Sequence, residues 1–187
     1  LHYTDRKSSQ GVERFMKHYY LIAKEVGDLT RIVCASLEEQ HKRTSRFRLP
    51  RLGNFGRKEI DGFILQGGRI ELSDKDLFKN DPVGIIRLFH TAHEQGADIH
   101  PDALKQVTRN LKRIDANLRK DEEANRLFLE LLVSRHDPET VLRHMNEAGV
   151  LGRFVPDFGR VVAQMQHDMY HVYTVDEHSI RAIGMLA

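Results

Sequence analysis

The chain lacks the features that define several classes of protein. Its 187 residues include one cysteine, so neither an internal disulfide nor a cysteine-built zinc site can form. No apolar run approaches the ~18 residues of a membrane span, and the first residues are polar and charged rather than signal-like. The formal net charge is only +2, which does not indicate a nucleic-acid or membrane binder. We therefore expect a soluble protein of the reducing cytoplasm.

Motifs for nucleotide and acyl chemistry are missing as well. The stretch 53–56 is too short for a phosphate-binding loop and lacks the Lys-Ser/Thr pair of such loops. No serine lies in a nucleophile elbow, and Cys34 lies among apolar residues of a predicted helix, where we expect a packed, unreactive thiol. A nucleotidyltransferase centre needs closely spaced carboxylates beside a Gly-Ser turn, and the chain has no Gly-Ser pair. We therefore predict no catalytic and no cofactor-binding residue within this chain.

What the sequence does contain is mostly helical patterning. Apolar residues step by three and four from about Ser9 to Gln40, which predicts one long helix. The stretch from Phe63 to Leu72 is apolar on both sides of Gly67-Gly68, which predicts a tight hairpin turn. The fold class predicted is mainly α: a multi-helical array with a long N-terminal helix and one short β-hairpin.

Start and stop signals divide the rest of the chain into shorter helices. Proline at a first helical position predicts helices after Asp81, His100 and Asp137, and another helix is expected from Asp121. Residues 151–165 are expected to form short helical pieces interrupted at Pro156. A capping box of Thr174 and Glu177 predicts a last helix that runs to the end of the chain.

A basic strip occupies residues 42–58, with seven lysines and arginines and no carboxylate before Glu59. Pro50 and two glycines argue against a continuous helix there. One interpretation is a linker that is solvated or covered by a partner. The other is an anion-binding strip, through which a stand-alone helical interaction module would dock an acidic partner or a nucleic acid.

Histidine is the abundant reactive residue type, with 11 copies. The pair His136-Asp137 has the form of a phosphohydrolase metal motif, but the proline that follows predicts a helix cap instead. His167 and His171 lie four residues apart, one above the other if helical. His178 lies at the fourth position of the last predicted helix, where a neutral imidazole could ligate a metal.

These last residues carry a resemblance to a known family. Residues 165–178, MQHDMYHVYTVDEH, resemble the segment that opens the HD domain of bifunctional uridylyltransferase/uridylyl-removing enzymes. The stretches VERFMKHYY at 12–20 and MNEAGVLGRF at 145–154 support the resemblance, which covers essentially the whole chain.

The resemblance implies the central part of an enzyme of nitrogen regulation. Residues 1–45 would be the end of the nucleotidyltransferase region, 46–165 a helical connector with the hairpin near 60–72, and 166–187 the first segment of the HD phosphohydrolase domain. The parent enzyme would use UTP to uridylylate the PII signalling protein. It would remove UMP by hydrolysis at an HD-domain metal, Mg or Mn, and sense glutamine through C-terminal domains outside this chain.

The resemblance also assigns one site residue. His178 matches the first metal ligand of the HD pattern, whereas the His-Asp pair and the distal aspartate would lie beyond Ala187. The family has an aromatic residue at the position of His167, so the pair His167 and His171 receives no role. We expect this chain alone to be inactive, to hold no metal tightly and to bind neither nucleic acid nor membrane. The apolar face that begins at Val12 would favour self-association.

Overall fold

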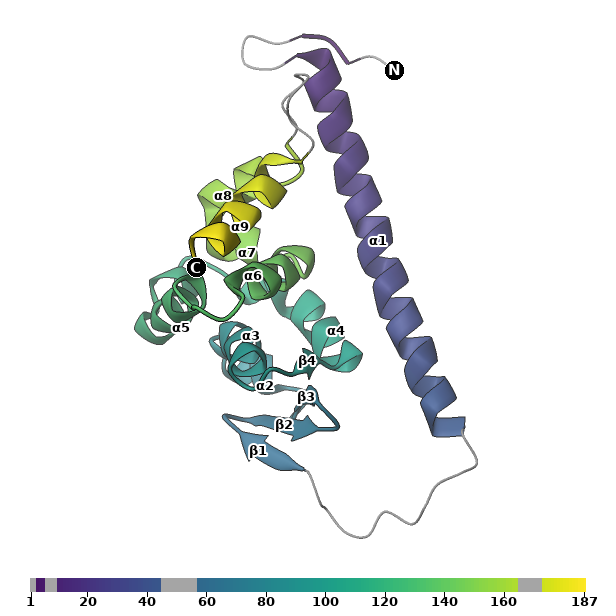
Figure 1. The fold of residues 1–187 in the computed structure, drawn as a ribbon, viewed down its shortest axis with the longest axis vertical. Helices are drawn as coiled ribbons and strands as arrows, with labels where there is room; N and C mark the ends of the chain where they lie inside the picture. Colours follow the sequence, from purple (N-terminus) through teal and green to yellow (C-terminus); the bar gives the residue numbers. More distant parts are fainter. Residues whose placement is uncertain (1–2, 6–9, 45–56, 165–172) are drawn as a thin grey trace. The chain divides into compact units, whose positions relative to one another are not determined.

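The computed structural model describes residues 3–5, 10–44, 57–164 and 173–187. Within these ranges it contains nine α-helices and one four-stranded sheet (Figure 1), which confirms the mainly α class. The chain divides into two compact units, residues 30–131 and residues 1–29 with 132–187, and each unit is described by itself. Among the described residues, no helix combines the length and the apolar character that crossing a membrane would require.

Helix α1 (Gly11–Thr44) is the long N-terminal helix that the periodicity predicts, and it continues four residues beyond the expected end at Gln40. Its apolar stripe is exposed: the exposed fraction is 50% at Ile22 and 55% at Val33. Cys34 is exposed as well, so the predicted packing of its thiol is wrong. The physical reason is that the apolar neighbours expected to enclose it are themselves open to solvent.

The sheet of the unit 30–131 is larger than the predicted hairpin. Strands β2 (Phe63–Gln66) and β3 (Arg69–Leu72) pair antiparallel around Gly67 and Gly68, whose φ angles of 60° and 76° fit a type I′ turn. The hairpin prediction is therefore confirmed. Two further strands extend it in the order β1-β2-β3-β4: β1 (Lys58–Ile60) pairs antiparallel with β2, and β4 (Asp98–Ile99) pairs parallel with β3.

Four helices accompany this sheet in the same unit: α2 (Leu77–Asn80), α3 (Gly84–Glu94), α4 (Pro101–Asn110) and α5 (Glu122–Leu132). Two 3-10 turns, 111–113 and 118–120, connect α4 to α5. The core consists of side chains with no exposed surface from the sheet and from α2, α3 and α4: Phe63, Ile70, Phe78, Ile85, Ile86, Leu88, Phe89 and Val107.

The predicted helix starts are mostly found. The His100 ring accepts the backbone N–H of Asp102 at 3.2 Å where α4 begins, and the Asp121 carboxylate accepts that of Ala124 at 2.9 Å where α5 begins. Helix α4, however, ends at Asn110 rather than near Asp115, because the chain tightens into a 3-10 turn there.

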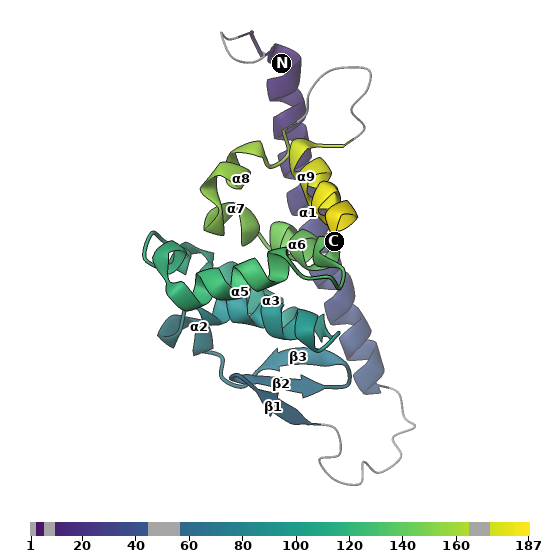
Figure 2. The ribbon, with the colours of Figure 1, turned by 60° about the vertical axis from the view of Figure 1, so that its left-hand side comes forward.

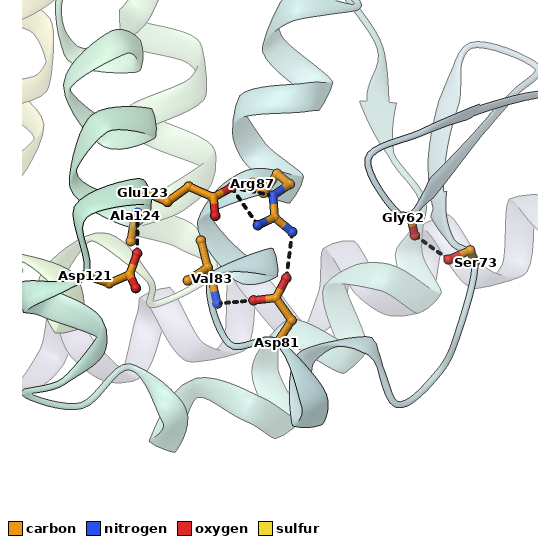
Figure 3. Close-up of polar contacts among 8 residues, drawn as sticks. All are labelled: Gly62, Ser73, Asp81, Val83, Arg87, Asp121, Glu123 and Ala124. Carbon is orange, nitrogen blue, oxygen red and sulfur yellow. Dashed lines mark hydrogen bonds and ion pairs between the residues drawn. The ribbon is translucent and has the colours of Figure 1, made fainter.

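Helix α3 begins at Gly84, two residues later than Asp81-Pro82 predicts. Residues 81–83 form a turn, and the Asp81 carboxylate accepts the N–H of Val83 at 3.1 Å. The other Asp81 oxygen accepts from Arg87 Nη1 at 2.6 Å, while Arg87 Nη2 donates to Glu123 on α5 at 2.6 Å (Figure 3). Burial alone would lower the pKa of Arg87, but its bonds to both carboxylates raise that pKa above the ordinary value, so the guanidinium stays charged.

The second unit contains α6 (Pro138–Glu147), α7 (Leu151–Phe154), α8 (Pro156–Val161) and α9 (Val175–Leu186). Asp137 adopts a left-handed conformation and accepts the N–H of Thr140 at 3.2 Å, which confirms that it caps α6. The predicted interruption at Pro156 separates α7 from α8. Figure 2 shows α6 and α9 packed side by side, and this packing positions the candidate site.

Candidate functional site

The first turn of α9 carries His178, the only site residue that the sequence assigns. The helix begins at Val175, where the sequence predicts it, and the His178 N–H donates to the Thr174 carbonyl oxygen at 2.9 Å. The predicted capping box is wrong, however, because the Thr174 side chain makes no capping hydrogen bond. The Glu177 carboxylate bonds instead to Arg143 on α6.

Asp176 fixes this first turn from the buried side. Its exposed fraction is 3%, and its two carboxylate oxygens accept from Asn146 Nδ2 at 3.0 Å and from the Ala163 N–H at 3.1 Å. Ala163 has a φ of 56°, so the segment that precedes α9 is held in a left-handed conformation at this contact. Sequence reasoning missed Asp176, because an acidic residue in a first helical turn usually faces solvent and favours the helix dipole.

Arg143 provides a second connection between α6 and α9. It donates to Glu139 Oε1 at 2.6 Å within α6 and to the Glu177 carboxylate on α9. Burial alone would lower the pKa of Arg143, but the hydrogen bonds and charges of Glu139 and Glu177 raise that pKa above its ordinary value. The guanidinium therefore stays charged at neutral pH.

Farther along α9, Gly184 allows the two helices to approach closely. A Cβ built on Gly184 would lie 2.8 Å from the Cβ of Glu139, closer than such atoms can pack. Glycine at this position therefore permits α9 to lie against the start of α6.

His178 itself is exposed, whereas Asp176, two residues earlier in the same turn, is buried. No hydrogen bond or ion pair holds its ring among the described residues. Its carboxylate neighbours Asp176 and Glu177 are already bonded to α6. In the part of the chain that the structure describes, no three histidine, cysteine, aspartate or glutamate side chains gather as a metal-binding group.

Several other sequence candidates are placed elsewhere or are not described. His90 on α3 bonds through Nε2 to Glu130 of α5 at 2.9 Å. His167 and His171 lie outside the described residues, and so does the basic strip from 45 to 56.

Comparison with known proteins agrees with the resemblance seen in the sequence. A family model described as "Uridylyltransferase GlnD third domain" matches residues 63–154, from β2 to the end of α7. A bifunctional uridylyltransferase/uridylyl-removing enzyme of Azospirillum brasilense is 59% identical over 185 residues, 98% of this chain and 20% of the relative. The enzyme of the same name from Rhodospirillum rubrum is 55% identical over 184 residues, 98% of this chain and 19% of the relative. No solved structure matches the chain.

These matches show that the chain is similar to a segment of known uridylyltransferases. More narrowly, the chain belongs to the bifunctional uridylyltransferase/uridylyl-removing enzyme family. It spans about a fifth of the length of the curated relatives it matches.

Proposed function

We propose that this chain acts as the central part of a cytoplasmic enzyme that attaches UMP from UTP to the PII signalling protein and removes it again. The observation that carries the proposal is the 59% identity over 185 residues to a relative with both activities in its name. In this proposal residues 1–45 end the transferase region, 46–165 connect it to the hydrolase, and 166–187 open the HD domain. Glutamine acts through domains outside this chain.

The role proposed for His178 is that of one ligand of the HD-domain metal, Mg or Mn. The arrangement fits one ligand, because the imidazole is exposed and has no partner among the described residues, while Asp176 and Glu177 hold its helical turn against α6. One imidazole gives neither a defined coordination geometry nor tight binding, so the remaining donors must come from elsewhere in the enzyme. The metal would supply polarisation of the UMP–tyrosine phosphodiester and activation of water.

The proposal is tested first on the chain alone. We expect no release of UMP from uridylylated PII with magnesium or manganese, because the described residues provide a single ligand. Turnover above a control without protein would show that the chain holds a complete site and would contradict this assignment.

The second test uses the complete enzyme. His178→Ala should abolish release of UMP and leave transfer of UMP from UTP unchanged, since only the hydrolytic metal loses a ligand. His136→Ala is the matched control: His136 is also an exposed histidine, beside the cap of α6, and both activities should survive its loss. Equal loss of hydrolysis in both variants would contradict the role of His178.

A further inference from the structure

Two adjoining hollows lie in the unit 30–131, between the segment that follows β3 and helix α4. Their volumes are about 510 Å³ and about 400 Å³. They share Lys75, Gln106 and Arg109 along their linings, so they form one continuous depression, which we call the basic groove.

The groove carries an excess of positive charge. Its carboxylates are Glu71, Asp76 and Asp102, and its cationic side chains are Lys75, Lys79, Lys105, Arg109, Lys112 and Arg113. The smaller hollow concentrates the charge, because five of its eight lining residues are lysine or arginine and one is acidic. Cations gathered in a concave surface repel one another, and an anion that binds there relieves the repulsion.

Three of these cations are available to a ligand. Lys79 is paired with Asp76, and Lys105 is paired with Asp102. Lys75, Arg109 and Lys112 are exposed, and no hydrogen bond or ion pair engages their side chains within the part of the chain that the structure describes.

A fourth cation, Arg113, is held in position. Its Nε donates to Asn110 Oδ1 at 3.1 Å, and its Nη1 donates to the Lys79 carbonyl oxygen at 3.2 Å. Asn110 is itself buried and donates to the Gln106 carbonyl oxygen at 2.9 Å. A guanidinium fixed by two such bonds loses little conformational entropy when its remaining N–H groups bind an anion.

The residues that line the groove indicate which class of anion it would bind. All eight residues of the smaller hollow are polar or charged, so it offers no apolar pocket for the aromatic or aliphatic anchor of a protein partner. The smaller hollow has no aromatic side chain on which a nucleobase could stack, and the only ring that lines the larger hollow is the largely buried imidazole of His100. Phosphate oxygens, in contrast, match clustered lysines and the forked donors of arginine.

We propose that the basic groove binds the phosphate groups of a compact polyphosphate anion, free or carried by a nucleotide, through Lys75, Arg109, Lys112 and Arg113. This inference goes beyond the proposed function and does not depend on it. It follows from the position of all four cations on the smaller hollow, whose lining has no apolar side chain.

The test measures binding of inorganic triphosphate to the chain by calorimetry in a metal-free buffer of low ionic strength. Combined replacement of Lys75, Arg109 and Lys112 by Gln should weaken the affinity by at least roughly tenfold. The fold should survive, because these exposed side chains form no hydrogen bond or ion pair with the described residues. Binding should also weaken as salt is raised from ~0.05 to ~0.3 M.

A matched control removes the same charge elsewhere. Lys58, Lys120 and Arg135 are exposed, line neither hollow and have no partner among the described residues, so their combined replacement by Gln should leave affinity within roughly twofold. Equal weakening in both triple variants would overturn the proposal, because net charge alone would then explain binding.

Two further ligands, UTP and polyglutamate, test whether the groove recognises phosphate groups. UTP should bind about as tightly as inorganic triphosphate and compete with it, because the four cations line the smaller hollow, which offers a base no aromatic side chain. Binding of UTP without binding of inorganic triphosphate would overturn the phosphate assignment. Binding of polyglutamate in its place would overturn the assignment in favour of an acidic protein partner.

Discussion

The buried carboxylate of Asp176 gives the sharpest quantitative prediction about the candidate site. Asp176→Ala removes the acceptor of two hydrogen bonds, from Asn146 Nδ2 and from the Ala163 N–H, at a position with 3% exposure. Hydrogen bonds to a charged group contribute ~1.5–3 kcal/mol each, and loss of one partner leaves buried donors without compensation. We therefore expect the free energy of unfolding to fall by about 3–5 kcal/mol.

Asp176→Asn separates charge from shape in the same place. The amide keeps the volume and one acceptor oxygen but directs an NH₂ group towards another donor, so we expect a smaller loss of about 1–3 kcal/mol. Asp157→Asn is the matched control. Asp157 pairs with Arg160 at the surface with 87% of its side chain exposed, and such pairs are worth ~0–1 kcal/mol.

Urea denaturation of the chain measures these differences, and amide hydrogen exchange shows where they act. Because Asp176 fixes the first turn of α9, protection in residues 177–186 should fall more than protection in the sheet of the other unit. A loss for Asp176→Ala no greater than that for Asp157→Asn would refute the reasoning that this carboxylate holds α9 against α6.

Three further predictions concern backbone packing and charge. Gly159→Ala should destabilise the chain by about 2–3 kcal/mol in denaturant titrations, because the new Cβ would lie 2.3 Å from the carbonyl oxygen of Gly152. Gly27→Ala in α1 meets no atom within 4 Å and should stabilise the helix by about 1 kcal/mol, seen as a higher melting temperature; a lower one would show a contact that the structure lacks. The hydrogen bond from Arg126 lowers the pKa of Glu130, so this bond stabilises the fold at neutral pH and is lost as pH falls through that lowered pKa. The stability difference between the native chain and Glu130→Gln should therefore shrink on acidification, and a constant difference would contradict the assignment.

Features set by local chemistry could be predicted from the sequence. Three predicted features depend on residues close together in the chain: the apolar spacing of α1, the Gly67-Gly68 turn and the Asp137 cap. The structure confirms all three. The turn between β1 and β2 had a comparable local signal in Asp61-Gly62, with φ angles of 51° and 84°, but β1 is too short to show an alternating pattern.

Features set by distant residues could not be predicted in this way. Strand β4 is only two residues long, and it is a strand because it pairs with β3, which lies almost 30 residues earlier in the chain. The capping box failed for a similar reason: Glu177 has a stronger partner in Arg143, 34 residues earlier, than in the amide of its own helix start. The role of Asp176 depends on Asn146 and Ala163, and nothing adjacent to it in sequence indicates that it is buried.

The parallel pairing of β3 with β4 sets an order of events during synthesis. The edge of β3 at residues 69–70 stays uncovered until residues 98–99 have been synthesised. Helices α2 and α3 are both synthesised in between. A nascent polypeptide that has emerged only as far as the hairpin therefore exposes an open edge next to Ile70, which is fully buried once folded. Ribosome-bound chains that stop before residue 98 should be more sensitive to protease around β3 than chains a few residues longer.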